Sequence, residues 1–277
     1  MRRIVLLMGI GMMAVSAGAQ TTTPAATPGN QAAGTETLPR AAAPATATGS
    51  ARPSAAGTSP GIQPSTMTRE QQLATDWAQL YAYKAANAGL AAPAPGEGRV
   101  VFYGDSITQG WDIAKSFPGK PYVNRGISGQ TTPQMLVRFR QDVIALKPQV
   151  VVILAGTNDI AQNTGPETLE QIEDNFASMA ELARANNIRV VLSSIMPVYD
   201  YPWRAGMEPV EKIRALNEWL RSYAAAHGDV YLDYFSAMQD ARHGLPPALS
   251  ADGVHPNAAG YAVMAPLAEK AIGEAEK

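Results

Sequence analysis

The sequence contains no cysteine among its 277 residues. This absence excludes disulfide bonds, thiolate metal sites, a cysteine nucleophile and lipid attachment through cysteine. An excess of basic residues is also missing: the formal charge is -2 and the pI is about 6.0, which argues against nucleic acid as a partner. The composition, 46% hydrophobic and 17% charged, is typical of a soluble globular protein.

The N-terminal apolar run, over residues 4–15, is shorter than the roughly 20 residues that a membrane-spanning helix requires. Two arginines precede the run and the small residues 17–19 follow it, so residues 1–19 are predicted to be a secretory signal peptide cut after Ala19. A retained membrane anchor is the alternative. We therefore expect a secreted or periplasmic protein with no stable membrane insertion after cleavage.

Residues 20–67 consist mainly of Ala, Thr, Pro, Gly and Ser and lack the aromatic residues that would offset the entropy cost of ordering. This composition predicts a disordered linker, with glycosylated threonines or the spanning of a cell-wall layer as alternatives. A folded domain is then expected over residues 68–277.

Within that domain, short apolar segments alternate with helical patterns, as expected for an α/β fold with a parallel sheet. Strands are predicted over 99–103, 121–124, 149–155, 188–195 and 230–234, and helices over 68–87, 132–146, 166–186, 209–227 and from 256 onward.

Ser106 follows the first of these strands in the stretch RVVFYGDSITQG, over residues 99–110. Gly104 lets the backbone turn sharply at the end of the strand, and the carboxyl edge of an open parallel sheet is where ligands bind. The sequence therefore predicts an exposed hydroxyl that can act as a nucleophile.

Two further turns are expected at the same edge. Gly126 and Gly129 lie where free backbone amides can donate to an oxyanion, and Asn158 follows the strand 149–155 with a side-chain NH2 donor. The glycines and Asn158 can also be explained without a functional role, because glycine is common where a loop needs an unusual backbone conformation and asparagine commonly forms turns.

Asp252 and His255 lie three residues apart in the loop before the last helix. One turn at this spacing can bring the carboxylate against the imidazole and hold the tautomer that a general base needs. Asp-Gly is equally a common turn, and His255 can cap the helix. The other histidines form no metal-ligand spacing with His255, so no metal site is predicted.

Aromatic residues near these loops are candidate substrate contacts. Trp111 follows the Ser106 turn, while Tyr199, Tyr201 and Trp203 lie in the long loop over residues 196–208. They can stack on a sugar or line an acyl pocket, and ordinary loop packing explains them as well.

Together, GDSIT at 104–108, NRGISG at 124–129, GTND at 156–159 and DGVHP at 252–256 resemble the four blocks of the SGNH hydrolases, also called GDSL lipases and esterases. The resemblance covers about residues 99–277. It implies a flavodoxin-like, three-layer α/β/α fold with a central five-stranded parallel sheet. Gln130 departs from the acid that some acylhydrolases and thioesterases of the family carry after the glycine.

In family terms, Ser106 resembles the nucleophile, His255 the base and Asp252 its orienting acid. The Ser106 amide, the Gly129 amide and the Asn158 side chain then form the oxyanion hole.

The resemblance implies a serine esterase that forms an acyl-enzyme and needs no cofactor or metal. Short-chain, acetyl O-esters of carbohydrates, either small molecules or polysaccharides, are the expected substrates. A lysophospholipase or thioesterase is the alternative, and a non-catalytic glycan-binding module is less favoured. No partner protein or oligomeric state is predicted.

Overall fold

The structure is a computed structural model that describes residues 68–277, so the predictions for residues 1–19 and 20–67 lie outside the described residues. The sheet has five parallel strands in the order β2-β1-β3-β4-β5. The strands are β1 (Val100–Gly104), β2 (Tyr122–Gly126), β3 (Val150–Leu154), β4 (Arg189–Ser193) and β5 (Val230–Leu232). The predicted five-stranded parallel sheet is confirmed, and its order is that of flavodoxin-like folds.

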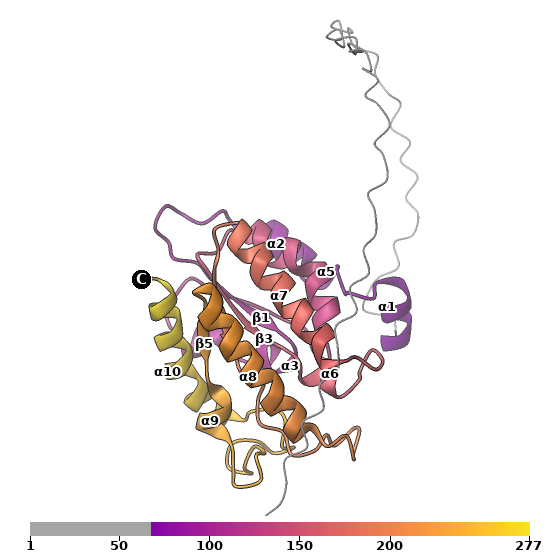
Figure 1. Ribbon diagram of the computed structural model, residues 1–277. Coiled ribbons are helices and arrows are strands. Elements are labelled where there is room, and N and C mark those ends of the chain that lie inside the picture. The colour runs from indigo at the N-terminus through magenta and orange to yellow at the C-terminus, as the bar shows by residue number, and fades with distance from the viewer. Residues whose placement is uncertain (1–67) are drawn as a thin grey trace, which may run out of the picture. The chain divides into compact units, whose positions relative to one another are not determined.

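Helices cover both faces of this sheet, which explains why the inner strands β1 and β3 are buried and uncharged along their whole length. Side chains alternate along β1: Val101 and Tyr103 belong to the core on the face covered by α5 (Thr132–Asp142), α7 (Leu169–Ala185) and α8 (Pro209–His227). Val100 and Phe102 face the other layer, which contains α4 (Ile113–Ser116), α9 (Tyr234–Met238) and α10 (Ala258–Ala275). Figure 1 views the sheet through α7 and α8.

The remaining elements are short. They are α1 (Arg69–Thr75), α2 (Lys84–Gly89), α3 (Ser106–Gln109), the 3-10 helix η2 (Ile144–Leu146) and α6 (Thr157–Ile160). Within residues 68–277, none of the helices is both long and apolar enough to cross a bilayer.

The prediction of one helix over residues 68–87 is wrong, because the chain forms turns between α1 and α2. Gln79 has a left-handed backbone with φ of 56°, and the Asp76 carboxylate accepts the Leu80 amide at 2.8 Å. The Leu80 carbonyl in turn accepts the side chain of Gln141, on α5, at 2.8 Å. These bonds replace helical ones and fasten the segment to α5.

The last predicted strand, 230–234, is shorter in the structure and ends at Leu232. Asp233 caps α9 instead, with its Oδ1 accepting the Ser236 amide at 2.9 Å. Capping competes with strand extension because it satisfies a free amide at the helix start.

Candidate active site

Ser106 lies at the carboxyl edge of the sheet, where β1 ends and α3 begins. The Asp105 carboxylate caps α3, its Oδ1 accepting the Ile107 amide at 2.9 Å. A Cβ at Gly104 would lie 2.6 Å from the Leu154 carbonyl oxygen, so only glycine fits between β1 and β3 here. The turn leaves Ser106 half-buried, with its amide in the first turn of a helix, where no intrahelical acceptor exists.

His255 and Asp252 lie close to Ser106, although they are far from it in the sequence. Ser106 Oγ lies 2.9 Å from His255 Nε2, and His255 Nδ1 lies 2.7 Å from Asp252 Oδ2. Because the carboxylate accepts from Nδ1, the neutral imidazole carries its proton there and leaves Nε2 free to accept the serine proton. The structure therefore brings together the three side chains predicted from the sequence, in the geometry of a nucleophile with its base.

Asp252 is held by hydrogen bonds that favour its charged form. Partial burial acts to raise the pKa of Asp252, but the backbone and side-chain hydrogen bonds from His255, together with the Val254 amide, outweigh burial and bring the pKa well below its usual value. The two amides donate to Asp252 Oδ1 at 2.8 and 2.9 Å. The carboxylate thus stays ionised and oriented at neutral pH.

Gly129 and Asn158 are, with the Ser106 amide, the predicted donors of the oxyanion hole. Gly129 has a left-handed backbone with φ of 76°, and within residues 68–277 no acceptor receives its amide proton. Asn158, buried in α6, donates from Nδ2 to the Gln130 carbonyl at 3.0 Å and to Asp105 Oδ2 at 3.3 Å. Both donors follow strands that adjoin β1, so they reach the edge where Ser106 lies.

Asp105 is a site residue that the sequence analysis did not single out, although it stands next to Ser106. It is fully buried, and burial raises the pKa of its carboxyl to about 6, with the Ile107 amide and the His255 charge opposing this rise. Its two oxygens connect the start of α3 with the Asn158 side chain.

The four candidate aromatic contacts occupy different places. The Trp203 ring is 44% exposed, and its centroid lies 6.2 Å from that of His255. Tyr199 is exposed under the guanidinium of Arg242. Tyr201 is buried behind Trp203, with ring centroids 5.2 Å apart.

Trp111 is also buried, and the structure does not bring it to the surface of the site. Its ring stacks on Tyr261 in the layer that contains α10, with centroids 5.5 Å apart, and its Nε1 donates to Ser116 Oγ at 2.8 Å. Of the four rings, Trp203 is therefore the one placed beside His255 with a free surface.

A buried arginine joins the two turns that carry Ser106 and Gly129. Arg138 is inaccessible to solvent and donates to the Gly104 and Arg125 carbonyls, each at 2.9 Å, at the ends of β1 and β2. Asp142 pairs with it at 3.1 Å. The sequence signal is an arginine and an aspartate four residues apart on a helix, a pattern that is usually solvated.

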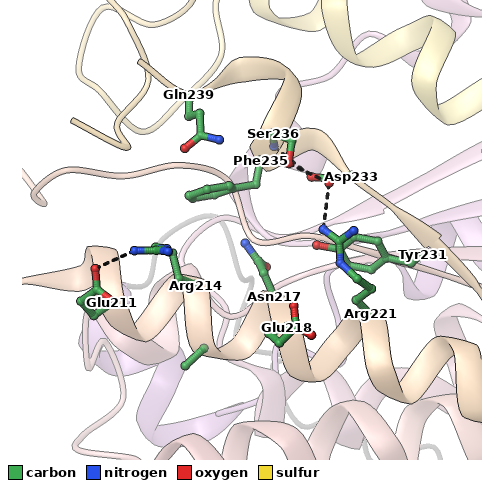
Figure 2. A pocket seen from close by; sticks show the side chains of 11 residues that line it. Glu211, Arg214, Asn217, Glu218, Arg221, Tyr231, Asp233, Phe235, Ser236 and Gln239 are labelled. Carbon is green, nitrogen blue, oxygen red and sulfur yellow. Dashed lines mark hydrogen bonds and ion pairs between the residues drawn. The ribbon is translucent and has the colours of Figure 1, made fainter. Parts of the chain in front are cut away.

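The hollow in Figure 2 lies away from this site. It has a volume of about 420 Å³ and is lined by α8, β5 and α9, with none of the predicted site residues. Four of its five charged groups pair, Arg214 with Glu211 at 3.2 Å and Arg221 with Asp233 at 3.1 Å, and the fifth is Glu218. Within residues 68–277, no three His, Asp or Glu side chains gather as a metal ion would require.

A family sequence model and a solved structure both show similarity to GDSL-like hydrolases. The sequence model of the GDSL-like Lipase/Acylhydrolase family matches residues 102–263. The solved structure of a GDSL-like lipase from Bacteroides thetaiotaomicron is 43% identical, covers 72% of this chain and 100% of its own, and superimposes with a TM-score of 0.70.

Three curated proteins are similar over shorter segments. Esterase TesA from Pseudomonas aeruginosa is 31% identical over 167 residues, which cover 55% of this chain and 77% of that protein. An acetylxylan esterase from Geobacillus stearothermophilus is 26% identical over 159 residues, 54% of this chain and 71% of that protein. An uncharacterized lipoprotein, YqeF, from Bacillus subtilis is 31% identical over 120 residues, 36% of this chain, and the match spans 49% of its length.

Proposed function

We propose that Ser106, His255 and Asp252 are the catalytic triad of this chain, which belongs to the GDSL-like lipase/acylhydrolase family and is a carboxylic ester hydrolase. The observation that carries the proposal is the continuous hydrogen-bond chain from Ser106 Oγ through the imidazole to the Asp252 carboxylate. A serine hydroxyl is a weak nucleophile unless a base this close removes its proton.

In the proposed reaction, His255 Nε2 takes the Ser106 proton as Oγ attacks the carbonyl carbon of the ester. The bond to the leaving alcohol then breaks, and His255 returns the proton to the alcohol oxygen. A water molecule, deprotonated by His255, then attacks the acyl-enzyme. The bond between the acyl carbon and Ser106 Oγ breaks, His255 returns the proton to Oγ, and the carboxylic acid leaves.

The amides of Ser106 and Gly129 and the Asn158 side chain stabilise the charge on the carbonyl oxygen. Asn158 Nδ2 has one contact at 3.0 Å and a longer one, to Asp105, at 3.3 Å. We assign the proton of the longer contact to the oxyanion, because that bond is the weaker of the two.

The proposed substrates are short-chain, acetyl O-esters of carbohydrates. The exposed Trp203 ring beside His255 supports this class, since an aromatic face is a surface on which a sugar can stack, with Tyr199 as a second exposed ring on the same loop. The similarity to an acetylxylan esterase supports it as well.

The test compares wild type with Ser106→Ala on acetylated xylan, lysophospholipids and aryl esters from acetyl to palmitoyl. We expect wild type to be fastest on acetyl esters and to react with a fluorophosphonate at Ser106, and the variant to lose both properties. A rate maximum at long acyl chains would refute the substrate class. Activity retained by Ser106→Ala would refute the triad.

We propose further that residues 1–19 direct export and that residues 20–67 tether the domain 68–277 outside the cytoplasm. The esterase and lipoprotein relatives are consistent with an extracellular or envelope location. Mass spectrometry of protein expressed in a bacterial host should find Gln20 as the N-terminus in the periplasm or medium. Intact protein that begins at Met1 in the cytoplasm would contradict cleavage.

A further inference from the structure

The loop that carries Trp203 is fastened to the segment that carries Asn158. Tyr201 OH lies 3.1 Å from Thr157 Oγ1, and Trp203 Nε1 donates to Asn163 Oδ1 at 3.1 Å. Asn163 Nδ2 then donates to Asn158 Oδ1 at 2.7 Å. A surface ring is therefore two hydrogen bonds from the buried amide assigned to the oxyanion hole.

The donor and acceptor of each hydrogen bond from Trp203 through Asn163 to Asn158 are determined by the groups at the two ends, the Trp203 indole and the Gln130 carbonyl. An indole N–H can only donate, so Trp203 must face the oxygen of Asn163, which leaves the Asn163 NH2 group to face Asn158. At the other end, the Gln130 carbonyl can only accept, so it requires the NH2 group of Asn158. Each asparagine amide has two orientations, and only one of them satisfies both ends.

We propose that Asn163 is a positioning residue for ester hydrolysis: it holds the Asn158 amide with Nδ2 toward the oxyanion, and the Trp203 indole fixes the orientation of Asn163. The inference rests on the proposed role of Asn158 as an oxyanion donor. If the Asn158 amide were reversed, its oxygen would meet the developing negative charge of the substrate and repel it.

The orientation of the Asn158 amide matters because the side chain is buried and its hydrogen-bond partners are protein groups. Asn158 is 2% exposed, so an unmade hydrogen bond there is not replaced by water. Its Nδ2 faces acceptors at Gln130 and Asp105, and of the described side chains Asn163 supplies the bond to its oxygen.

The test uses Asn163→Asp, which preserves the shape of the side chain and the acceptor for Trp203 but removes the donor to Asn158. We expect kcat on an aryl acetate to fall about tenfold to hundredfold with KM changed much less, because part of an oxyanion donor's contribution is lost. Trp203→Phe, which keeps a ring but removes the N–H, should lower kcat less and in the same direction. Asn186→Asp makes the same chemical change at the exposed C-terminus of α7 and should leave kcat unchanged.

A double-mutant cycle with Asn158→Ala identifies the route of the effect. If Asn163 acts through Asn158, adding Asn163→Asp or Trp203→Phe to Asn158→Ala should lower kcat no further. The same loss in both backgrounds, or unchanged kcat in both single variants, would overturn the positioning role while leaving the triad intact. An unchanged kcat in Asn158→Ala alone would instead refute the proposed oxyanion donor, and the inference with it.

Discussion

Replacing Asp159 by asparagine should remove a large part of the pH dependence of stability. Asp159 follows Asn158 in the chain and is 1% exposed. Its Oδ1 accepts the Thr132 amide at 2.8 Å. Among the described residues, the buried Asp159 Oδ2 and Glu167 Oε2 have no hydrogen-bond partner, so a charge on Asp159 is left uncompensated there and a proton is favoured. Burial, with the nearby Glu167 charge, raises the pKa of Asp159 to about 8.

The sign of the effect follows from proton binding. The folded state keeps a proton that the unfolded state, with an ordinary Asp pKa near 4, has released. The contribution of Asp159 to stability is therefore fully present below about pH 4 and is lost as pH rises to about 8. The slope in this window is about 1.4 kcal/mol per pH unit for one proton. From pH 6 to pH 7.5, the contribution of Asp159 therefore falls by about 2 kcal/mol, or roughly 4–8 °C in Tm for a domain of this size.

The assay is urea unfolding at pH 6, 6.5, 7 and 7.5. Asp159→Asn keeps the acceptor for Thr132 and removes the titrating carboxyl, so the free energy of unfolding of the variant should rise relative to that of wild type as pH rises. Glu181→Gln, which removes an exposed carboxylate from α7, is the matched control and should follow the wild-type curve. Parallel curves for wild type and Asp159→Asn across the whole range would refute the retention of a proton by Asp159.

Three more substitutions test other parts of the structure. Asp252→Asn should lower kcat about ten-thousandfold with little change in Tm, because the imidazole loses the acceptor that sets its tautomer; a loss under tenfold in a steady-state aryl acetate assay would contradict this. Arg138→Met leaves the buried charge of Asp142 without its partner and should cost about 3–5 kcal/mol in urea unfolding, whereas a cost below 1 kcal/mol would mean that the pair is dispensable. Tyr83→Phe removes the hydroxyl that donates to the Gly126 carbonyl and should cost about 1 kcal/mol by the same measurement, while unchanged stability would show that water replaces the bond.

The sheet and the positions of the site residues could be predicted from the sequence because both follow local rules. A buried parallel strand needs an unbroken apolar run, such as 149–155, and polar residues directly after such runs must lie at one edge of the sheet. Ser106 and Asn158 could therefore be predicted to lie at the same carboxyl edge, and the structure shows that the strands before them are neighbours. The short spacing in the sequence also placed Asp252 within one turn of His255.

Long-range contacts explain what the sequence did not reveal. The segment 76–83 has helical spacing, yet it forms turns in which Gln79 is left-handed and the Leu80 carbonyl accepts from Gln141 on α5. Similarly, an aromatic residue in a loop does not disclose its orientation: Tyr201 points inward to Thr157 while Trp203, two residues later, faces solvent beside His255. The roles of Asp105 and Asn163 each depend on one partner far away in the chain, Asn158 for Asp105 and Trp203 for Asn163, so no local sequence pattern indicates them.

The fastening of the 196–208 loop to Asn163 bears on engineering. Transplanting a foreign segment here is a natural way to alter which alcohol the enzyme accepts, because the segment borders His255 without contributing to the triad. Its indole, however, also sets the amide beneath it. Designers who exchange the segment should keep tryptophan at 203 or redesign residue 163 with it, since otherwise a change intended for selectivity would lower turnover on every ester.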